Sequence, residues 1–468
     1  MRLPPLSSKL FTVLALIVAL LLPLGLVRNL VAERESRRDD VTAEVARGHA
    51  GAQVLAGPVL WVPYTETHVR LLPADTAGGR PREETVTETL AMTIFPQQLD
   101  SRVELATDTR WRGLFPVTVY DSTHAGTGRF VWRVPEPGRP GARIALGTPV
   151  VLFGISDPRG LHAAPRLVVD GVAREVAPLA PGPLPAPLPL GAALAGTLPQ
   201  PGAVLEFGWT MSLAGTGSLA WVPLATENTV ALRSAWPHPS FGGSFLPRER
   251  RVQTDGFEAR WRVPALSSQA QQQFLRDAAH PQVWERFAVT LADPVDLYRL
   301  TDRATKYAVV FIVLSFAAFL LLELVRRWRI HPVQYLMIGL ALIVFYLLLL
   351  SLAEHLGFAR AYVLAAAACV GLLGVYLRHV LGSARAGLGA GTTFAALYGV
   401  LYAILVSEDN ALVMGALLLF GVLALAMLAT RRLDWYALSA PVGGPLAPPS
   451  PPAAPVAGPT TASMTTRA

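Results

Sequence analysis

The sequence contains a single cysteine, Cys369, and only two lysines, Lys9 and Lys306. One cysteine excludes a disulfide within the chain and any metal site built from several cysteines. Charged residues make up 16% of the 468 residues, well below the roughly 25% of a typical soluble domain. This shortage of charge, together with 52% hydrophobic residues, indicates a membrane protein.

Several catalytic signatures are also missing. The chain has no H-E-x-x-H zinc motif, no G-x-S-x-G nucleophile elbow and no G-x-x-x-x-G-K-[ST] phosphate loop. The glycine-rich string GLGAGTTF at 387–394 opens a hydrophobic run and follows no strand, so it indicates helix packing or the start of a span. The sequence therefore predicts a protein that is not an enzyme and that needs no cofactor or metal.

The net charge of +7 does not predict nucleic-acid binding. Between residues 32 and 303, arginines and carboxylates are about equal in number, and the positive excess lies beside the hydrophobic runs. Basic residues in that position orient membrane helices. The expected partners are the lipid bilayer and another envelope protein or a lipid, with no nucleic acid. The sequence predicts no oligomeric state.

Six hydrophobic runs are long enough to cross a membrane, whose hydrocarbon core of ~30 Å requires about 20 apolar helical residues. They cover residues 10–27, 307–325, 333–352, 361–377, 388–406 and 411–429. The first run could instead be a cleaved signal peptide. However, it is longer than the usual 7–15 residues of such a segment, and no A-x-A site follows it. We therefore expect an uncleaved anchor.

The charges of the short loops predict the orientation of these helices, because loops rich in arginine stay in the cytoplasm. Such loops follow the second, fourth and sixth runs, whereas the other loops contain Glu354 with Arg360, and Glu408 with Asp409. Both termini should then be cytoplasmic and residues 32–303 outside the cytoplasm.

Residues 32–303 have the pattern of a β-rich, sandwich-like domain. The clearest strands are rich in β-branched and aromatic residues and cover 129–134, 203–213, 229–236 and 257–263. The strings TGRFVWRVP and DGFEARWRVP resemble each other. They indicate either an internal duplication or two amphipathic strands of one common type. A loop is expected over 181–201, and a short helix interrupted by Pro281 over 267–287.

The predicted fold class is a membrane protein with an N-terminal transmembrane helix, a large all-β extracytoplasmic domain and a C-terminal bundle of five transmembrane helices. The expected divisions are 1–31 for the N-terminus and first helix, 32–303 for the β-rich domain, 304–436 for the other helices, and 437–468 for a disordered cytoplasmic tail rich in Pro and Ala.

Long segments of the chain resemble the CreD inner membrane protein family. They include GPVLWVPY, RGLFPVTVY and SAWPHPSFGGSFLPRER in the β-rich region, and VDLYRLTDRATKYAVVFIVLSF and HPVQYLMIGLALIVFYLLLL in the helical region. The resemblance extends over about residues 7–436 and leaves out the proline-rich tail. It implies a multi-pass protein of the bacterial inner membrane, with residues 32–303 in the periplasm. It also implies a role in cell-envelope integrity, in association with a two-component system that responds to envelope or nutrient stress. It implies no reaction, substrate or cofactor.

Two polar pairs at the outer ends of spans, Glu354–His355 and Glu408–Asp409, are the main candidates for a functional site. Such pairs can relay protons or bind a metal when loops bring them together, but they are more often helix caps at the water boundary. Glu323, near the inner end of its span, is expected to pair with Arg326 or Arg327 at helical spacing.

Three further residues are weaker candidates. His331, followed by Pro332, opens a span and indicates either a contact with a partner or a helix start. Trp236 and His238, in the string WPHPSF, indicate either a binding loop or a rigid turn with buried aromatic rings.

The favoured function is a non-enzymatic envelope protein that senses, supports or protects the envelope through its outer domain. The alternative is a transporter or lipid-handling protein, since a helical bundle could move a substrate that the outer domain receives. The middles of the spans carry no Asp, Glu, Lys or Arg, which disfavours ion coupling. A membrane-embedded hydrolase is the third possibility, and no recognisable constellation supports it.

Overall fold

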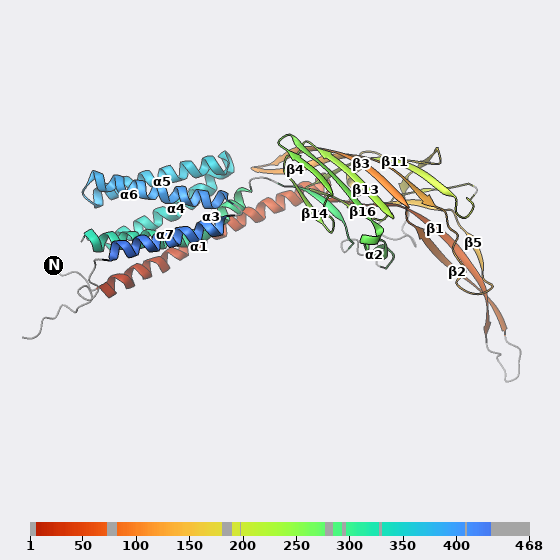
Figure 1. The fold of residues 1–468 in the computed structure, drawn as a ribbon, viewed down its shortest axis with the longest axis horizontal. Helices are drawn as coiled ribbons and strands as arrows, with labels where there is room; N and C mark the ends of the chain where they lie inside the picture. Colours follow the sequence, from red (N-terminus) through yellow and green to blue (C-terminus); the bar gives the residue numbers. More distant parts are fainter. Residues whose placement is uncertain are drawn as a thin grey trace, which may run out of the picture. The chain divides into compact units, whose positions relative to one another are not determined.

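The computed structural model describes residues 6–72, 82–179, 190–196, 198–276, 284–292, 296–326, 330–407 and 410–431. The chain forms two compact units. The helical unit contains Met1–Val27, Arg303–Leu348 and Val363–Ala468, and the strand unit contains Arg28–Asp302 and Leu349–Tyr362. The predicted fold class is confirmed, because along the chain an N-terminal apolar helix precedes a large domain of β-sheets and a set of apolar helices follows it (Figure 1).

Six long helices carry the hydrophobic runs: α1 (Leu6–Gly48), α3 (Leu297–Arg326), α4 (Pro332–Leu356), α5 (Phe358–Val380), α6 (Ala384–Val406) and α7 (Ala411–Thr430). Among the described residues, the first five of these are long and apolar enough to cross a membrane. The apolar stretch described in α7, Val413–Leu428, is shorter. Five spans therefore satisfy this criterion and the sixth predicted span is represented by this shorter stretch.

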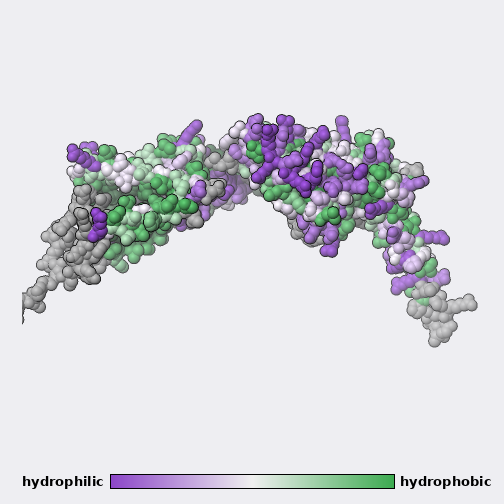
Figure 2. Space-filling model, viewed as in Figure 1, coloured by the Kyte–Doolittle hydropathy of each residue, from purple (hydrophilic) through white to green (hydrophobic). Residues whose placement is uncertain are grey.

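The helical unit buries several aromatic rings and exposes many large apolar side chains. Tyr398 of α6 lies 4.9 Å from the ring of Phe311 in α3 and 4.5 Å from that of Phe345 in α4, measured between ring centroids. Large apolar side chains such as Phe11, Leu22 and Leu26 of α1 are more than two-thirds exposed. Figure 2 shows the resulting hydrophobic surface of the helices, which is suited to lipid rather than water.

The strand unit is built from two sheets. In the first sheet the order is β14 (Pro239–Gly243), β17 (Phe287–Leu291), β12 (Ser218–Val222), β1 (Gln53–Leu72), β6 (Val150–Ile155), β10 (Leu190–Ala193) and β9 (Ala177–Pro178), while β2 (Arg82–Ile94) and β5 (Arg143–Leu146) also pair with β1. In the second sheet it is β15 (Glu249–Gln253), β16 (Gly256–Pro264), β13 (Glu227–Ser234), β3 (Gln98–Arg112), β4 (Phe115–Val131), β11 (Val204–Thr216), β7 (Arg166–Val169) and β8 (Val172–Glu175).

The two sheets enclose one hydrophobic core. Side chains alternate between the core and the surface along β4, β11 and β16, as the period of a strand requires. Aromatic rings of the two sheets meet there: Phe153 lies 5.9 Å from Trp209, and Trp221 lies 6.1 Å from Trp261. Opposite Trp209, a Cβ atom at Gly126 would lie 2.2 Å from the indole nitrogen, so only glycine fits under this ring.

All four predicted strands are present in the second sheet, in β4, β11, β13 and β16. The two similar strings fall at the end of β4 and in β16, where Trp132 and Trp261 both face the core. β3 and β13 are parallel neighbours, yet β4 lies outside β3 and β16 lies outside β13. The strand pairs β3–β4 and β13–β16 are therefore mirror images of each other when viewed from the core. No rotation can superimpose them while the same face points to the core, as a duplication would require. This order fits two amphipathic strands of a common type better than a duplication.

The main part of the strand unit, Arg28–Asp302, begins and ends close to the expected 32–303, but strands do not occupy its first residues. α1 continues to Gly48 without a further proline after Pro23, and the first strand begins at Gln53. The expected short helix is α2 (Ala270–Arg276), and Pro281 lies outside the described residues. The expected loop over 181–201 contains β10, while residues 181–189, 197 and 432–468 also lie outside the description.

Candidate functional site

Residues of α1, of the start of α3 and of the end of α4 meet in one cluster of charged and aromatic residues within the strand unit. Arg38 of α1 donates from Nη1 to Asp296 Oδ1 at 2.9 Å, and its guanidinium lies 5.6 Å from the centre of the Tyr298 ring. Tyr298, in the first turn of α3, donates its hydroxyl proton to Glu354 Oε1 of α4 at 3.1 Å. Arg34 Nε lies 3.9 Å from the same oxygen. We call these five residues the junction cluster.

Hydrophobic contacts surround the junction cluster. Tyr298 belongs to one hydrophobic cluster with Val31 and Val41 of α1, with Leu350 of α4, and with the buried face of the β3–β4 hairpin. On that face lie Phe115, Val117 and Val119, which are all less than 9% exposed. The first turn of α3 and the last turns of α4 are therefore fixed to the sheets by a common core. A change in the sheets that moved this hairpin would strain the helix ends directly.

The structure separates the two members of the Glu354–His355 pair. Glu354 belongs to the junction cluster and its side chain is only 9% exposed, whereas His355 is exposed on another side of α4. Successive helical residues point about 100° apart, which explains the divergence. Glu408 and Asp409 lie outside the described residues, so whether the two pairs converge stays a prediction.

A second polar cluster lies within the helical unit. Glu323 of α3 is 6% exposed and forms an ion pair with Lys9 of α1. The other Glu323 contacts are the backbone nitrogen of Ile330, at 3.2 Å, and the hydroxyl of Tyr335 in α4, at 3.3 Å. The sequence predicted Arg326 or Arg327 as the partner, but the side chain of Arg326 and all of Arg327 lie outside the described residues. We call Lys9, Glu323 and Tyr335 the α1–α3–α4 polar cluster.

His331 lies directly before α4, as predicted by the interpretation of this residue as part of a helix start. Its Nδ1 accepts a hydrogen bond from the Val333 backbone nitrogen at 3.3 Å, and its own backbone nitrogen donates to Gln334 Oε1 at 2.9 Å. These two bonds satisfy backbone donors at the start of α4, with Pro332 at the first helical position. The contacts explain His331 without a partner.

Trp236 and His238 lie in a rigid turn before β14. The indole nitrogen of Trp236 donates to the backbone oxygens of His238 and Ala292, each at 3.2 Å. Phe241 packs edge-on against Phe257 and Trp261 of β16, with ring centroids 5.7 Å apart in both cases. The rings of Trp236 and Phe241 therefore pack against the hydrophobic core, whereas His238 is exposed.

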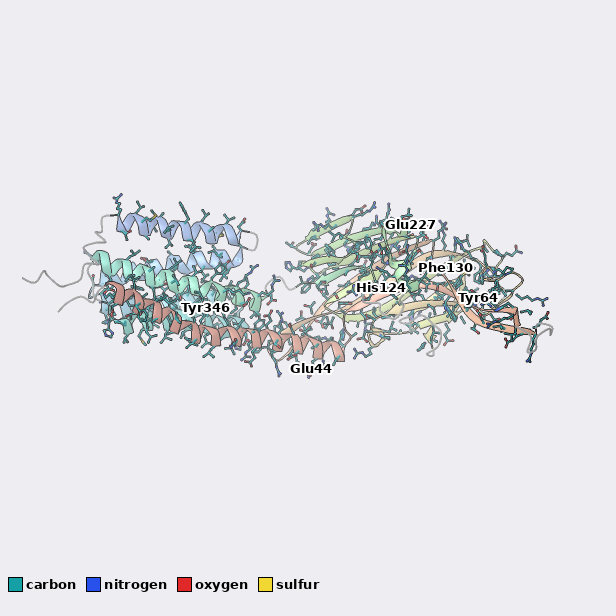
Figure 3. The ribbon with its side chains drawn as sticks, turned by 90° about the horizontal axis from the view of Figure 1, so that it is seen from below. Glu44, Tyr64, His124, Phe130, Glu227 and Tyr346 are labelled. Carbon is teal, nitrogen blue, oxygen red and sulfur yellow. The ribbon has the colours of Figure 1, made fainter. Side chains whose placement is uncertain are left out.

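A buried histidine that the sequence did not single out lies between the sheets. His124 of β4 is fully buried, and Figure 3 shows it among the strands near Phe130. Its Nε2 lies 2.9 Å from Ser122 Oγ, which itself donates to the Leu213 backbone oxygen at 2.7 Å. Nε2 therefore carries the proton, and Nδ1 has no hydrogen-bond partner among the described residues. Burial lowers the pKa of His124 from 6.5 to about 4.

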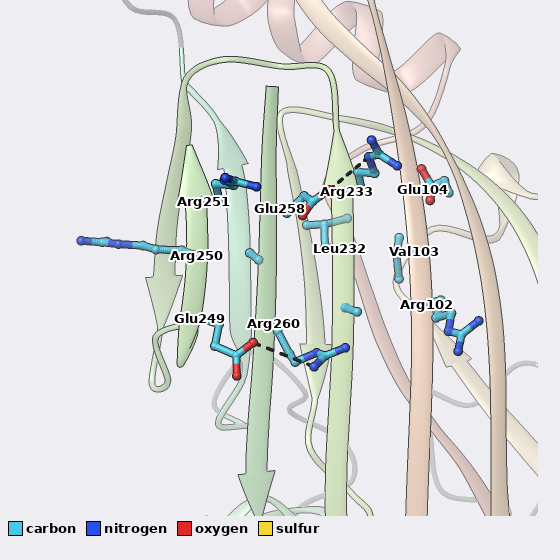
Figure 4. Close-up of a pocket in the computed structure, with 12 residues that line it drawn as sticks. Arg102, Val103, Glu104, Leu232, Arg233, Glu249, Arg250, Arg251, Glu258 and Arg260 are labelled. Atoms are coloured by element: carbon cyan, nitrogen blue, oxygen red, sulfur yellow. Dashed lines mark ion pairs between the residues drawn. The ribbon is translucent and has the colours of Figure 1, made fainter. Parts of the chain in front are cut away.

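A shallow groove of about 460 Å³ lies on the outer face of the second sheet, across β3, β13, β16 and β15. Figure 4 shows its arginines and glutamates, and Figure 2 shows the hydrophilic surface they form. Cross-strand ion pairs join Arg233 to Glu258 at 3.4 Å and Arg260 to Glu249 at 3.9 Å. These side chains are more than half exposed, so solvent screens them. The groove has the character of a solvated charged face.

The comparisons with known proteins agree with this architecture. The family model described as "Inner membrane protein CreD" matches residues 5–436. The inner membrane protein CreD of Escherichia coli strain K12 is 33% identical over 448 residues, which are 93% of this chain and 95% of that protein.

Solved structures add little. An M1 zinc metallopeptidase from Deinococcus radiodurans is 9% identical, with a TM-score of 0.21 over 42% of each chain. A protein from Legionella pneumophila described as a "putative nutrient binding protein" is 8% identical, with a TM-score of 0.19 over 45% of this chain and 72% of that one. Neither similarity supports a shared fold. The family match and the identity across nearly the whole length decide the relationship: the chain belongs to the CreD family of inner membrane proteins.

Proposed function

We propose that this protein is a non-enzymatic component of the cell envelope whose two-sheet domain lies in the periplasm. In this proposal the domain supports the envelope or responds to its state, and the junction cluster couples it to the membrane helices. The observation that carries the proposal is the common core of the β3–β4 hairpin with the ends of α1, α3 and α4. A flexible tether would suffice to hold a domain at the membrane, whereas a packed junction suits the transmission of strain.

The coupling can be tested with Arg38→Ala. This change removes a charge-assisted hydrogen bond to Asp296 and a cation–π contact with Tyr298. Together they are worth about 2–4 kcal/mol in a partly buried position. We expect the variant to reach the membrane at the normal level but to fail to restore resistance to envelope stress in a strain that lacks the gene.

Arg37→Ala is the matched control, because Arg37 is the exposed neighbour of Arg38 on the same helix. It should restore the strain fully. If Arg38→Ala also restores it fully at an equal protein level, the junction does not carry the function. The measurement is survival under a detergent or a cell-wall antibiotic, with the protein quantified in isolated membranes.

The orientation gives a separate prediction. In a Cys369→Ala background, a thiol at Asp255, in the exposed β15–β16 turn, should react with a membrane-impermeant maleimide in intact cells. A thiol at Ser383, between α5 and α6, should react only after the inner membrane is opened. Asp157 would be a poor labelling position, because its carboxylate accepts from the Gly51 nitrogen at 3.0 Å and pairs with Arg159. The reverse labelling pattern would place the sheets in the cytoplasm.

A further inference from the structure

Two edge strands of the strand unit leave one side of their backbone free. β2 pairs with β1 on one side, and none of the described residues pairs with its other side. In the same way, β15 pairs with β16 and with no other described strand. The free side of an edge strand exposes N–H and C=O groups that can bind a further strand. Each of these two strands therefore offers a place where its sheet can be extended.

Two other edge strands are protected by proline. β14 contains Pro239, and β9 ends at Pro178. A proline has no N–H to donate, so it disfavours the addition of a strand. β2 and β15 contain no proline and keep all of their backbone donors. The feature that selects a partner for these two edges is therefore their charge.

β15 begins with one acidic and two basic residues, Glu249, Arg250 and Arg251, which are all exposed. Consecutive residues of a strand point to opposite faces, and Figure 4 shows the side chains of Arg250 and Arg251 directed apart. Glu249 lies 3.9 Å from Arg260, while neither Arg250 nor Arg251 forms an ion pair with a described residue. Both faces of this edge thus carry a guanidinium group that is free to pair.

β2 begins with the inverse order, one basic and two acidic residues, Arg82, Glu83 and Glu84. All three are exposed, and none forms an ion pair with a described residue. The ion pair that β2 does form uses Glu88, which lies further along the strand. The free charges of β2 are therefore gathered at its first three residues.

A parallel alignment of the two strands places every one of these charges beside an opposite charge. The neighbours in this alignment are Arg82 with Glu249, Glu83 with Arg250, Glu84 with Arg251 and Thr85 with Val252. Opposite charges on neighbouring strands stabilise their pairing, and like charges weaken it. An in-register alignment of either strand with its own copy instead places like charges side by side. The two edges therefore fit each other better than they fit themselves.

The same alignment continues the alternation of charge across the second sheet. Arg260 and Glu249 are opposite each other on β16 and β15, and Arg82 would be the next residue in that row. Glu258 and Arg251 are opposite each other in the row beside it, and Glu84 would follow them. β2 and β15 belong to different sheets of one chain, so this pairing requires two copies.

We propose that copies of this protein assemble head to tail, with β2 of one copy added in parallel to β15 of the next. Each copy uses different surfaces for its two neighbours, so the assembly is a ring where the rotation closes and a filament where it does not. Exposed charge pairs are weak individually. Confinement of the copies to one membrane raises their effective concentration and favours the contact. The assembly requires the same insertion of all copies, whichever side of the membrane the sheets occupy.

Disulfide cross-linking in isolated native membranes tests the register. In a Cys369→Ala background, one version of the full-length protein carries Thr85→Cys, and a differently tagged version carries Val252→Cys. Neighbouring strands lie about 4.8 Å apart, which is within the range that a disulfide can bridge. With copper phenanthroline as the oxidant, we expect a mixed dimer when both versions share a membrane. Either version alone should give roughly tenfold less cross-linked product.

An exchange of charges tests the cause of the pairing. Glu83→Arg combined with Glu84→Arg in the first version should lower the yield of mixed dimer roughly tenfold, because like charges then lie side by side. Arg250→Glu combined with Arg251→Glu in the second version should restore the yield. These four positions are exposed, so the thermal unfolding of each variant should match that of its parent.

The matched control is Glu175→Arg combined with Glu206→Arg, which reverses two exposed charges on β8 and β11 and should leave the yield unchanged. Three outcomes overturn the proposal. The first is the absence of a mixed dimer, and the second is a mixed dimer whose yield ignores the charge exchange. The third is a cross-link of either cysteine to a different protein in place of the mixed dimer, which would assign that edge to a foreign partner.

Discussion

Between pH 6.5 and pH 4, the two-sheet domain is expected to lose about 3 kcal/mol of folding free energy through His124 alone. Burial lowers the pKa of this imidazole to about 4, while the unfolded chain binds the proton near 6.5. In this interval the unfolded state therefore holds more protons than the folded state. The stabilisation is complete above pH 6.5 and is lost as the pH falls toward 4.

The packing explains why His124 resists protonation. Its ring stacks on Trp209 with centroids 6.2 Å apart and lies 6.3 Å from the Trp221 ring. A second proton would have to go to Nδ1, which has no acceptor among the described residues. Charging this ring would therefore bury a cation without a partner, which costs several kcal/mol unless the structure opens.

The measurement is thermal unfolding of the full-length protein followed by tryptophan fluorescence, which reports mainly on the sheets because eight of the ten tryptophans lie between Trp61 and Trp284. His124→Gln is the control, since its amide can still donate to Ser122 but does not titrate. Near neutral pH the wild type should be the more stable protein, and the difference should vanish or reverse near pH 4. Parallel pH profiles for the two proteins would exclude this role of His124.

The second large effect is expected at the α1–α3–α4 polar cluster. Lys9→Met leaves the Glu323 carboxylate buried without its cation, and removal of one partner from a buried ion pair costs about 3–5 kcal/mol. Glu323→Gln should cost less. Its amide oxygen can still accept from the Ile330 nitrogen, its amide nitrogen can donate to the Tyr335 hydroxyl, and the Lys9 side chain, which is 23% exposed, can turn toward water. The two single variants should therefore differ although they break the same pair.

The double variant separates the pair from its surroundings. Lys9→Met combined with Glu323→Gln contains no unpaired charge, so it should recover most of the stability that Lys9→Met loses. The measurement is the midpoint of thermal unfolding in detergent, followed by a probe in the helical unit such as a dye at Cys369, which becomes reactive when its buried thiol is exposed. If the two single effects simply add in the double variant, Lys9 and Glu323 are not coupled.

Local patterns in the sequence predicted much of the fold. Runs without charge marked α3, α4, α5 and α6, because lipid tolerates few charged residues in such helices. Alternation of large apolar residues with arginine marked β16 and the end of β4, because the two faces of a strand meet different environments. The extension of α1 to Gly48 was less evident, since a polar helix beyond the membrane lacks a hydrophobic pattern of its own.

The sites were harder to predict because their partners are distant in the sequence. Glu323 is paired with Lys9 across 314 residues, whereas helical spacing suggested only its neighbours. Glu354 was identified as a candidate, but Tyr298, Arg34 and Arg38 were not, because nothing local links three helices. For both clusters, the signal available in the sequence was a carboxylate residue near the end of an otherwise uncharged hydrophobic run. His124 had a weaker signal, namely a histidine at a core-facing position of an alternating strand.

The parallel pairing of β1 with β12 has a consequence for how the protein is made. Gln53 pairs with Leu219, and the adjacent Thr216 bonds to Ala50 across 166 residues. At 5–20 residues per second, synthesis of that interval takes roughly 8–33 s. During this time β1 has been synthesised but β12 has not, so the edge of β1 that β12 will cover is open to aggregation. The two sheets therefore close late in synthesis. The unfinished domain is most exposed to aggregation before that point, so this is when protection by the cell matters most.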